Sequence, residues 1–109
     1  MTDKQWHQQI LANTIDRLRE TLEYKGWEYA SDESPYQNFY GGASLKNESP
    51  ERVLWGYLTK HIISLKDAID GRQVDYTEKI KDIQAYLVLL EGLLHKRDNR
   101  ASGYTSTHT

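Results

Sequence analysis

The chain has 109 residues and a net charge of −2, from 14 basic and 16 acidic side chains. This length predicts one domain that can bury a core, and the balanced charge gives no electrostatic signature of binding to a nucleic-acid backbone. The absence of cysteine excludes disulfides and thiolate metal sites. No apolar run approaches the roughly 18 residues that span a bilayer, and residues 1–4 do not begin a signal peptide. We therefore expect a cytoplasmic protein with neither a membrane nor a nucleic acid as a partner.

The first predicted element is a helix from about Asp3 to Tyr29. Its aliphatic side chains recur every three or four residues and form one helical face, while acidic side chains occupy the opposite, solvated face. The aliphatic face consists of Leu11, Ile15, Leu18 and Leu22, and the acidic face of Asp16, Glu20 and Glu23. Gly26 predicts an end or a kink of this helix before Ser31.

Residues 31–48 are predicted to form a long loop, because Pro35 and the Gly41-Gly42 pair interrupt regular structure. The rings of this segment are too apolar for a flexible linker, so we expect them to pack over the end of the helical core. They are Tyr36, Phe39 and Tyr40. A short helix around Tyr36–Phe39 is one alternative, and a binding role is another, since long loops in compact domains are often functional.

The second long helix is predicted from Pro50 to Asp70, with Ser49 as its N-cap and Gly71 directly after its C-terminus. Its apolar side chains follow helical spacing and include one histidine in the same stripe. They are Leu54, Leu58, His61, Ile62, Leu65 and Ile69.

The third helix is predicted over residues 76–97, where Asp75 and Glu78 form a capping box and Thr77 is a rival cap. Its main apolar stripe consists of Ile80, Ile83, Leu87, Leu90 and Leu94. A second apolar strip lies on roughly the opposite face and consists of Ala85, Leu89 and Leu93. A helix with two apolar faces is central in its domain or shared with another subunit, so this strip predicts a homodimer or a higher homo-oligomer built on the third helix.

The expected fold is therefore all-α: a bundle of three main helices with an ordered aromatic loop. We place the helical domain at residues 1–97. Residues 98–109 are polar and without periodicity, which predicts a disordered tail.

Two groups of polar side chains are candidates for chemistry. Glu78 and Asp82 are one helical turn apart and could hold Mg²⁺ or Mn²⁺ through oxygen ligands; alternatively they cap the helix and pair with a lysine. On the second helix, Lys60 beside His61 could bind phosphate or serve in acid–base chemistry. The alternative is a core histidine and a surface network between Lys60 and Asp67.

Short strings of the chain resemble small phage and prophage proteins akin to the nucleotide-modification-associated family. These proteins are in turn similar to the MazG-type all-α nucleoside triphosphate pyrophosphohydrolases. The strings are KGWEYA at residues 25–30, PYQNF at residues 35–39, Lys60-His61, and EKIKDIQAYL at residues 78–87. The resemblance covers roughly residues 18–94.

The resemblance implies a helical bundle that handles nucleotides as a dimer or tetramer in the host cytoplasm. In the pyrophosphohydrolases, acidic residues on two helices hold Mg²⁺ against the phosphates. Glu78 and Asp82 match the second acidic element, but the first element offers only Asp67 as a carboxylate, beside Lys60 and His61. This departure favours nucleotide binding over hydrolysis. The ligand-binding residues that we predict are Lys25, Tyr36, Asn38 and Phe39.

Three functions compete at this point. The first is Mg²⁺-dependent hydrolysis of a nucleoside triphosphate to the monophosphate and pyrophosphate. The second is a non-catalytic protein that sequesters a nucleotide. The third is a protein–protein adaptor that acts on a host or phage partner through the aromatic loop and the second face of the third helix.

Overall fold

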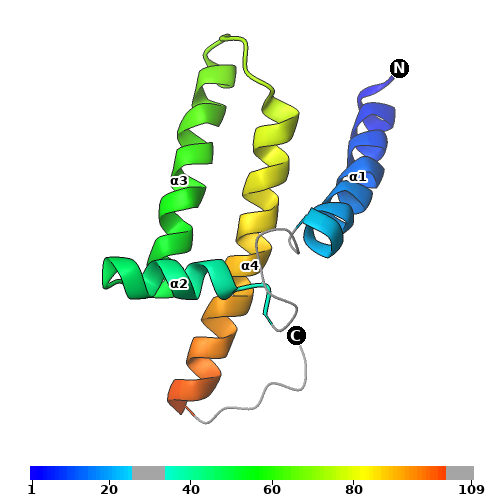
Figure 1. The fold of residues 1–109 in the computed structure, drawn as a ribbon. Coiled ribbons are helices and arrows are strands. Elements are labelled where there is room, and N and C mark those ends of the chain that lie inside the picture. The colour runs from blue at the N-terminus through cyan, green and yellow to red at the C-terminus, as the bar shows by residue number, and fades with distance from the viewer. Residues whose placement is uncertain (26–33, 103–109) are drawn as a thin grey trace.

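The computed structural model describes residues 1–25 and 34–102, and within them the protein is all-α, without a β-strand. The elements are α1 (Asp3–Glu20), the π-helical turn η1 (Thr21–Lys25), α2 (Gln37–Lys46), α3 (Pro50–Ile69) and α4 (Tyr76–Ser102) (Figure 1). The prediction of an all-α fold is confirmed. Among the described helices, none has the length and apolar character that a membrane crossing requires.

Helices α3 and α4 form an antiparallel hairpin that is the centre of the fold (Figure 1). Both helices begin at the predicted caps: the Ser49 hydroxyl accepts the backbone N–H of Arg52 at 3.2 Å, and the Asp75 carboxylate accepts the backbone N–H of Glu78 at 3.1 Å. The turn after α3 contains Gly71 at a φ of 88°, a left-handed conformation that glycine adopts without steric cost. The predicted start and end of the α3 segment are therefore confirmed.

Helix α2 replaces most of the predicted loop and crosses the hairpin near the start of α3 (Figure 1). The prediction of a loop over residues 31–48 is wrong for residues 37–46; the alternative of a short helix around Tyr36–Phe39 is confirmed in part, because the helix begins there and continues through Gly41 and Gly42 to Lys46. A Cβ atom on Gly42 would lie 2.9 Å from a methyl carbon of Val53 in α3, so the absence of a side chain permits the two helices to approach. Helix α2 ends at Asn47, which adopts the left-handed conformation.

The hydrophobic core lies where α2 meets the α3–α4 hairpin. Its buried members are Phe39, Val53, Leu54, Leu58 and Leu93. Phe39 is 6% exposed, which confirms the prediction that this ring packs against the helices. Tyr36 is half-buried, and its hydroxyl lies where a side chain at position 92 would project, so Gly92 provides the space for this ring.

Helix α1 lies beside α4 and contributes no buried residue (Figure 1). Leu18 and Leu22 are half-buried, whereas Leu11 and Ile15 on the same stripe are 53% and 55% exposed. Among the described elements, α1 and η1 pack on α4, and the half-buried residues of α1 lie in its C-terminal half. Three long helices sharing one core were expected; the core that the structure describes is formed by α2, α3 and α4.

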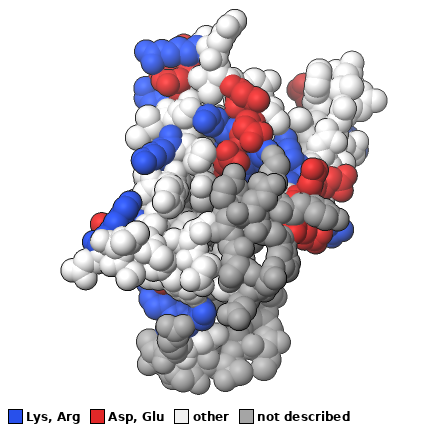
Figure 2. Space-filling model, in the orientation of Figure 1, with Lys and Arg blue, Asp and Glu red and all other residues white. Residues whose placement is uncertain are grey.

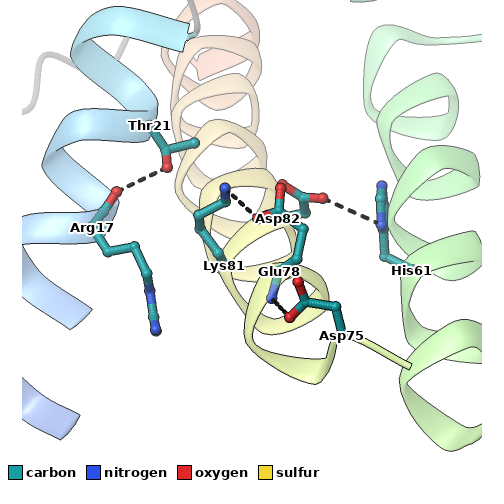
Figure 3. A network of polar contacts seen from close by, with 7 residues as sticks. All are labelled: Arg17, Thr21, His61, Asp75, Glu78, Lys81 and Asp82. Atoms are coloured by element: carbon teal, nitrogen blue, oxygen red, sulfur yellow. Dashed lines mark hydrogen bonds and ion pairs between the residues drawn. The ribbon is translucent and has the colours of Figure 1, made fainter. Parts of the chain in front are cut away.

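Two further expectations concern the ends of the helices. Helix α4 continues to Ser102, so residues 98–102 of the predicted tail are helical and residues 103–109 lie outside the described part. The first helical segment reaches Lys25 by way of η1, where the Thr21 hydroxyl donates to the Arg17 carbonyl at 2.8 Å (Figure 3). The predicted break at Gly26 also lies outside the described residues.

The second apolar strip of α4 is covered within the chain. Ala85 is 7% exposed, Leu93 is 2% exposed and Leu89 is half-buried against the core. The prediction of a subunit interface made by this strip is therefore wrong. The prediction fails because helix α2, which the sequence predicts as a loop, carries Phe39 into the core beside Leu93.

Candidate ligand-binding site

Four ring side chains from three helices form a contiguous aromatic cluster, defined as Phe39 from α2, Tyr57 and His61 from α3, and Tyr86 from α4. The Tyr57 and Tyr86 rings are stacked, with centroids 6.4 Å apart and planes within 9°. Phe39 meets both rings edge-on at 6.3 and 6.4 Å. The His61 ring lies 5.4 Å from Tyr86. The cluster joins α2 to both helices of the hairpin.

Helical spacing explains why these side chains meet. Tyr57 and His61 are four residues apart on α3, and Asp82 and Tyr86 are four residues apart on α4, so each pair shares one helical face. Because the two helices are antiparallel, His61 lies level with Asp82, which places Tyr57 and Tyr86 one turn further along the same seam. Phe39 is buried beneath the seam, while Tyr57 remains 40% exposed at the surface.

Two lysines place their ammonium groups over the exposed ring of Tyr57, in cation–π geometry. The Lys46 ammonium, at the end of α2, is 5.8 Å from the ring centroid, and the Lys60 ammonium, on α3, is 5.9 Å from it. Neither lysine has an ion-pair partner in the part of the chain that the structure describes. Figure 2 shows several Lys and Arg side chains along the α3 edge of this view, with Asp and Glu side chains among them at its upper end. Two cationic groups without a described ion-pair partner therefore lie within 6 Å of the centroid of the Tyr57 ring.

His61 and Asp82 point toward one another across the hairpin (Figure 3). The imidazole Nδ1 lies 3.7 Å from a carboxylate oxygen, and the two side chains are 23% and 29% exposed. This separation is longer than a hydrogen bond, so the two side chains face one another without forming one. The arrangement brings together two residues that the sequence singled out for different reasons, one for phosphate binding and one for metal binding.

The three carboxylates predicted to hold Mg²⁺ lie next to three different basic groups. Glu78 pairs with the Lys81 ammonium at 2.7 Å, Asp67 with Arg72 at 2.9 Å, and Asp82 faces His61. Within the described residues, no three His, Cys, Asp or Glu side chains are arranged so that they could hold a metal ion. The donor set Glu78, Asp82 and Asp67 therefore does not fit a shared Mg²⁺ ion.

The pairing of Glu78 with Lys81 has a clear physical cause. The Lys81 side chain is only 10% exposed, and a buried ammonium without a counter-charge is costly. Glu78 lies three residues earlier on the same helix and is half exposed, so its carboxylate supplies that charge at little cost to itself. Figure 3 shows this pair on the α1 side of α4, while Asp82 turns toward α3.

The remaining predicted ligand residues are dispersed. Phe39 belongs to the cluster but is buried, Asn38 is exposed on α2, and the side chain of Lys25 lies outside the described residues. Tyr36 meets Tyr40 edge-on at 6.4 Å instead of joining the cluster.

A separate hollow of about 470 Å³ lies at the start of α3. Its lining residues are Tyr40, Ser49, Pro50, Glu51, Leu93, Lys96 and Arg97. Its two basic groups already have partners: the Lys96 ammonium donates to the Tyr40 hydroxyl at 2.7 Å, and Arg97 pairs with Asp98 at 2.9 Å. A phosphate would compete with these contacts, so the unpaired lysines at Tyr57 offer the better anion site.

Sequence reasoning missed three residues of the candidate site. Tyr57 stands one turn before Lys60 and His61, and Tyr86 stands one turn after Asp82, so helical spacing from the residues already chosen would have found both. No spacing in the sequence identifies Lys46, because its position beside Tyr57 depends on how α2 crosses α3.

The chain was also compared with known proteins. The family resemblance described above rests on its four sequence strings alone. No protein-family model, curated protein or solved structure matches the chain.

Proposed function

We propose that the protein binds a nucleotide, with the base stacked on the exposed ring of Tyr57 and the phosphate oxygens held by Lys46 and Lys60. The observation that carries this proposal is an exposed aromatic ring with two unpaired ammonium groups within 6 Å of its centroid. Stacking of a base on an aromatic side chain contributes about 1–3 kcal/mol. The lysine ammonium groups attract phosphate electrostatically, whichever base the nucleotide contains.

His61 and Asp82 extend the site along the seam toward the turn of the hairpin. The imidazole lies 5.4 Å from the Tyr86 ring, at a tilt of 35°, and its Nδ1 lies 3.7 Å from the Asp82 carboxylate. A ring nitrogen held there can form a hydrogen bond with a phosphate or a sugar hydroxyl of a ligand stacked on Tyr57. The family resemblance in Lys60-His61 and in residues 78–87 supports the same class of ligand.

Binding without catalysis is the form of this function that the residues favour. Metal-assisted hydrolysis requires ligands that hold the ion against the phosphates, and the predicted carboxylates lie beside separate basic partners. A base stacked on Tyr57, with its phosphates held by Lys46 and Lys60, needs no such ion. We therefore expect nucleotide binding in the presence of a chelator, with the nucleotide recovered intact.

A thermal-shift titration tests this proposal. Ribo- and deoxyribonucleoside triphosphates are titrated in EDTA and in Mg²⁺, because a ligand that binds only the folded protein at about 100 times its Kd adds about 2.7 kcal/mol to the unfolding free energy. A rise in Tm that survives EDTA supports binding. Release of pyrophosphate only in Mg²⁺ would favour hydrolysis instead, and no response to any nucleotide would favour the adaptor hypothesis.

Substitutions then locate the site. Tyr57→Leu keeps an apolar side chain and removes the stacking surface, so affinity should fall by roughly 5- to 150-fold, which corresponds to about 1–3 kcal/mol. Lys60→Gln should weaken nucleotide binding, and the difference from the unsubstituted protein should become smaller at higher salt, because salt screens the lysine charge. The matched control is Lys66→Gln, an exposed lysine of the same helix that pairs with Asp70 at 2.9 Å. Equal losses in Lys60→Gln and Lys66→Gln would contradict the site.

A further inference from the structure

The α3–α4 hairpin exposes two apolar stripes with the same spacing. On α3, Trp55, Ile62 and Ile69 follow one another at intervals of seven residues and are 50%, 43% and 79% exposed. On α4, Ile80, Leu87 and Leu94 also follow at intervals of seven; Leu87 is 49% exposed and the other two are half-buried. A repeat of seven is the period at which helices pack against other helices over several turns.

Both stripes lie on the face of the hairpin that is turned away from α2. Val53 of α3 packs against Gly42 of α2, and Trp55 follows it by two residues, which rotates its side chain by about 200° around the helix. Gly92 of α4 lies against Tyr36, and Leu94 is likewise two residues further on. Helix α2 lies on the near side of the hairpin in Figure 1, so the stripes lie on its far side. We call this surface, formed by the six residues of the two stripes, the back face.

We propose that the back face binds a second copy of this chain, so that two hairpins form a four-helix bundle around a two-fold axis. A two-fold axis brings the same patch of each subunit together. Two antiparallel helices with stripes of equal period are suited to such self-pairing, because each stripe finds a partner stripe of matching spacing on the other copy. This interface differs from the Ala85–Leu93 strip, which the chain covers itself.

The amount of apolar surface fits a dimer. Trp55, Ile62, Ile69 and Leu87 are 43–79% exposed, and so is Tyr76, which adjoins the back face one turn before Ile80; together they present about 600 Å² of accessible surface. A standard interface buries about 800 Å² on each partner. The half-buried residues of the α4 stripe and the polar residues along the margins supply the difference. The Tyr57 site stays open in this arrangement, because it lies on the α2 side of α3.

Charges along the two margins indicate how the hairpins pair. Arg52 precedes Trp55 by one turn, and Glu91 follows Leu87 by one turn, so a basic side chain flanks the α3 stripe and an acidic one flanks the α4 stripe. His61 and Asp82 lie level across the hairpin; Arg52 is nine residues before His61 and Glu91 nine residues after Asp82, so they are level as well. We orient the two-fold axis parallel to the helices of the bundle, so that α3 of one copy packs on α4 of the other. In this arrangement Arg52 meets Glu91 of the partner subunit.

Light scattering of the full chain measures the oligomeric state. We expect twice the 12.7 kDa mass of one chain at micromolar concentration. Ile62→Glu places a charge at the centre of the back face and should yield a monomer with an unchanged helical circular-dichroism spectrum. The matched control is Ile63→Glu: Ile63 is more exposed, at 66%, but its side chain is rotated by about 100° out of the back face, so this variant should remain a dimer.

A charge exchange tests the orientation independently of any change in folding. Arg52→Glu and Glu91→Arg should each weaken the dimer several-fold, and the double variant should recover much of the loss because the pair is restored with reversed signs. A mass of one chain for the unsubstituted protein at every concentration would overturn the proposal. So would a dimer that persists in Ile62→Glu and dissociates in Leu11→Glu, since the exposed stripe of α1 would then be the interface.

Discussion

Gly41 and Gly42 are adjacent in α2 but have different surroundings. A side chain at Gly41 would meet nothing within 4 Å, whereas one at Gly42 would meet the Val53 side chain, which is 3% exposed. Glycine inside a helix costs about 1 kcal/mol relative to alanine. The structure therefore gives a packing reason for one of the two glycines and none for the other.

The two positions should respond oppositely to the same substitution. Gly41→Ala should raise the unfolding free energy by about 1 kcal/mol, because it restores helix propensity without a clash. Gly42→Ala should lower it by about 1–3 kcal/mol, because the branched Val53 side chain has little freedom to move aside in the core. Urea unfolding of both variants provides the measurement. Equal stabilisation by both would mean that α2 does not approach α3 as closely as the structure has it.

At the scale of single elements, features with a local cause were predictable and features with a distant cause were not. The caps Ser49 and Asp75 depend on hydrogen bonds within three residues, and both are where the sequence places them. The full extent of helix α2 was missed because its glycines disfavour a helix locally; the contact with Val53 explains Gly42, and nothing in the structure explains Gly41. The stripe of α1 was recognised correctly as one face, but periodicity does not indicate whether another element covers that face.

Helix α1 should consequently be the least stable element of the described fold. It has no buried residue, and it exposes Trp6, Ile10, Leu11 and Ile15. Regions with few buried contacts open at low free energy. In a native-state hydrogen-exchange experiment, the amides of α1 should exchange well before those of α3 around Leu54 and Leu58. Protection of α1 equal to that of α3 would contradict this and would indicate that a second surface covers the helix.

At the scale of the whole molecule, the candidate site combines predicted and unpredicted residues. Lys60, His61 and Asp82 were chosen from the sequence and lie within one region, since helical spacing and a short connection between α3 and α4 bring them together. The three carboxylates predicted to hold Mg²⁺ do not share one site. Glu78 pairs with Lys81 and Asp67 pairs with Arg72, and these pairings depend on which side of each helix faces solvent. The position of Lys46 required the tertiary arrangement of α2.

The distribution of burial across the molecule leads to a last prediction. Leu54 and Leu11 occupy equivalent places in the stripes of their helices, and from the sequence both belong to a shared core. In the structure Leu54 is 0% exposed and Leu11 is 53% exposed. Leu54→Ala should therefore lower the unfolding free energy by about 2–5 kcal/mol, because it removes buried methyl groups and leaves a cavity. Leu11→Ala should change it by less than about 0.5 kcal/mol.

The two leucine variants are best compared by urea unfolding at one fixed protein concentration, since dimerisation would make the apparent stability depend on concentration. Because both variants replace leucine with alanine inside a helix, changes in helix propensity and side-chain entropy nearly cancel. The difference between their unfolding free energies therefore reports the difference in burial. A large loss in both variants would show that α1 shares the core after all, within the chain or across a subunit interface. Light scattering of Leu11→Ala separates these two cases, because only the second predicts a weaker dimer.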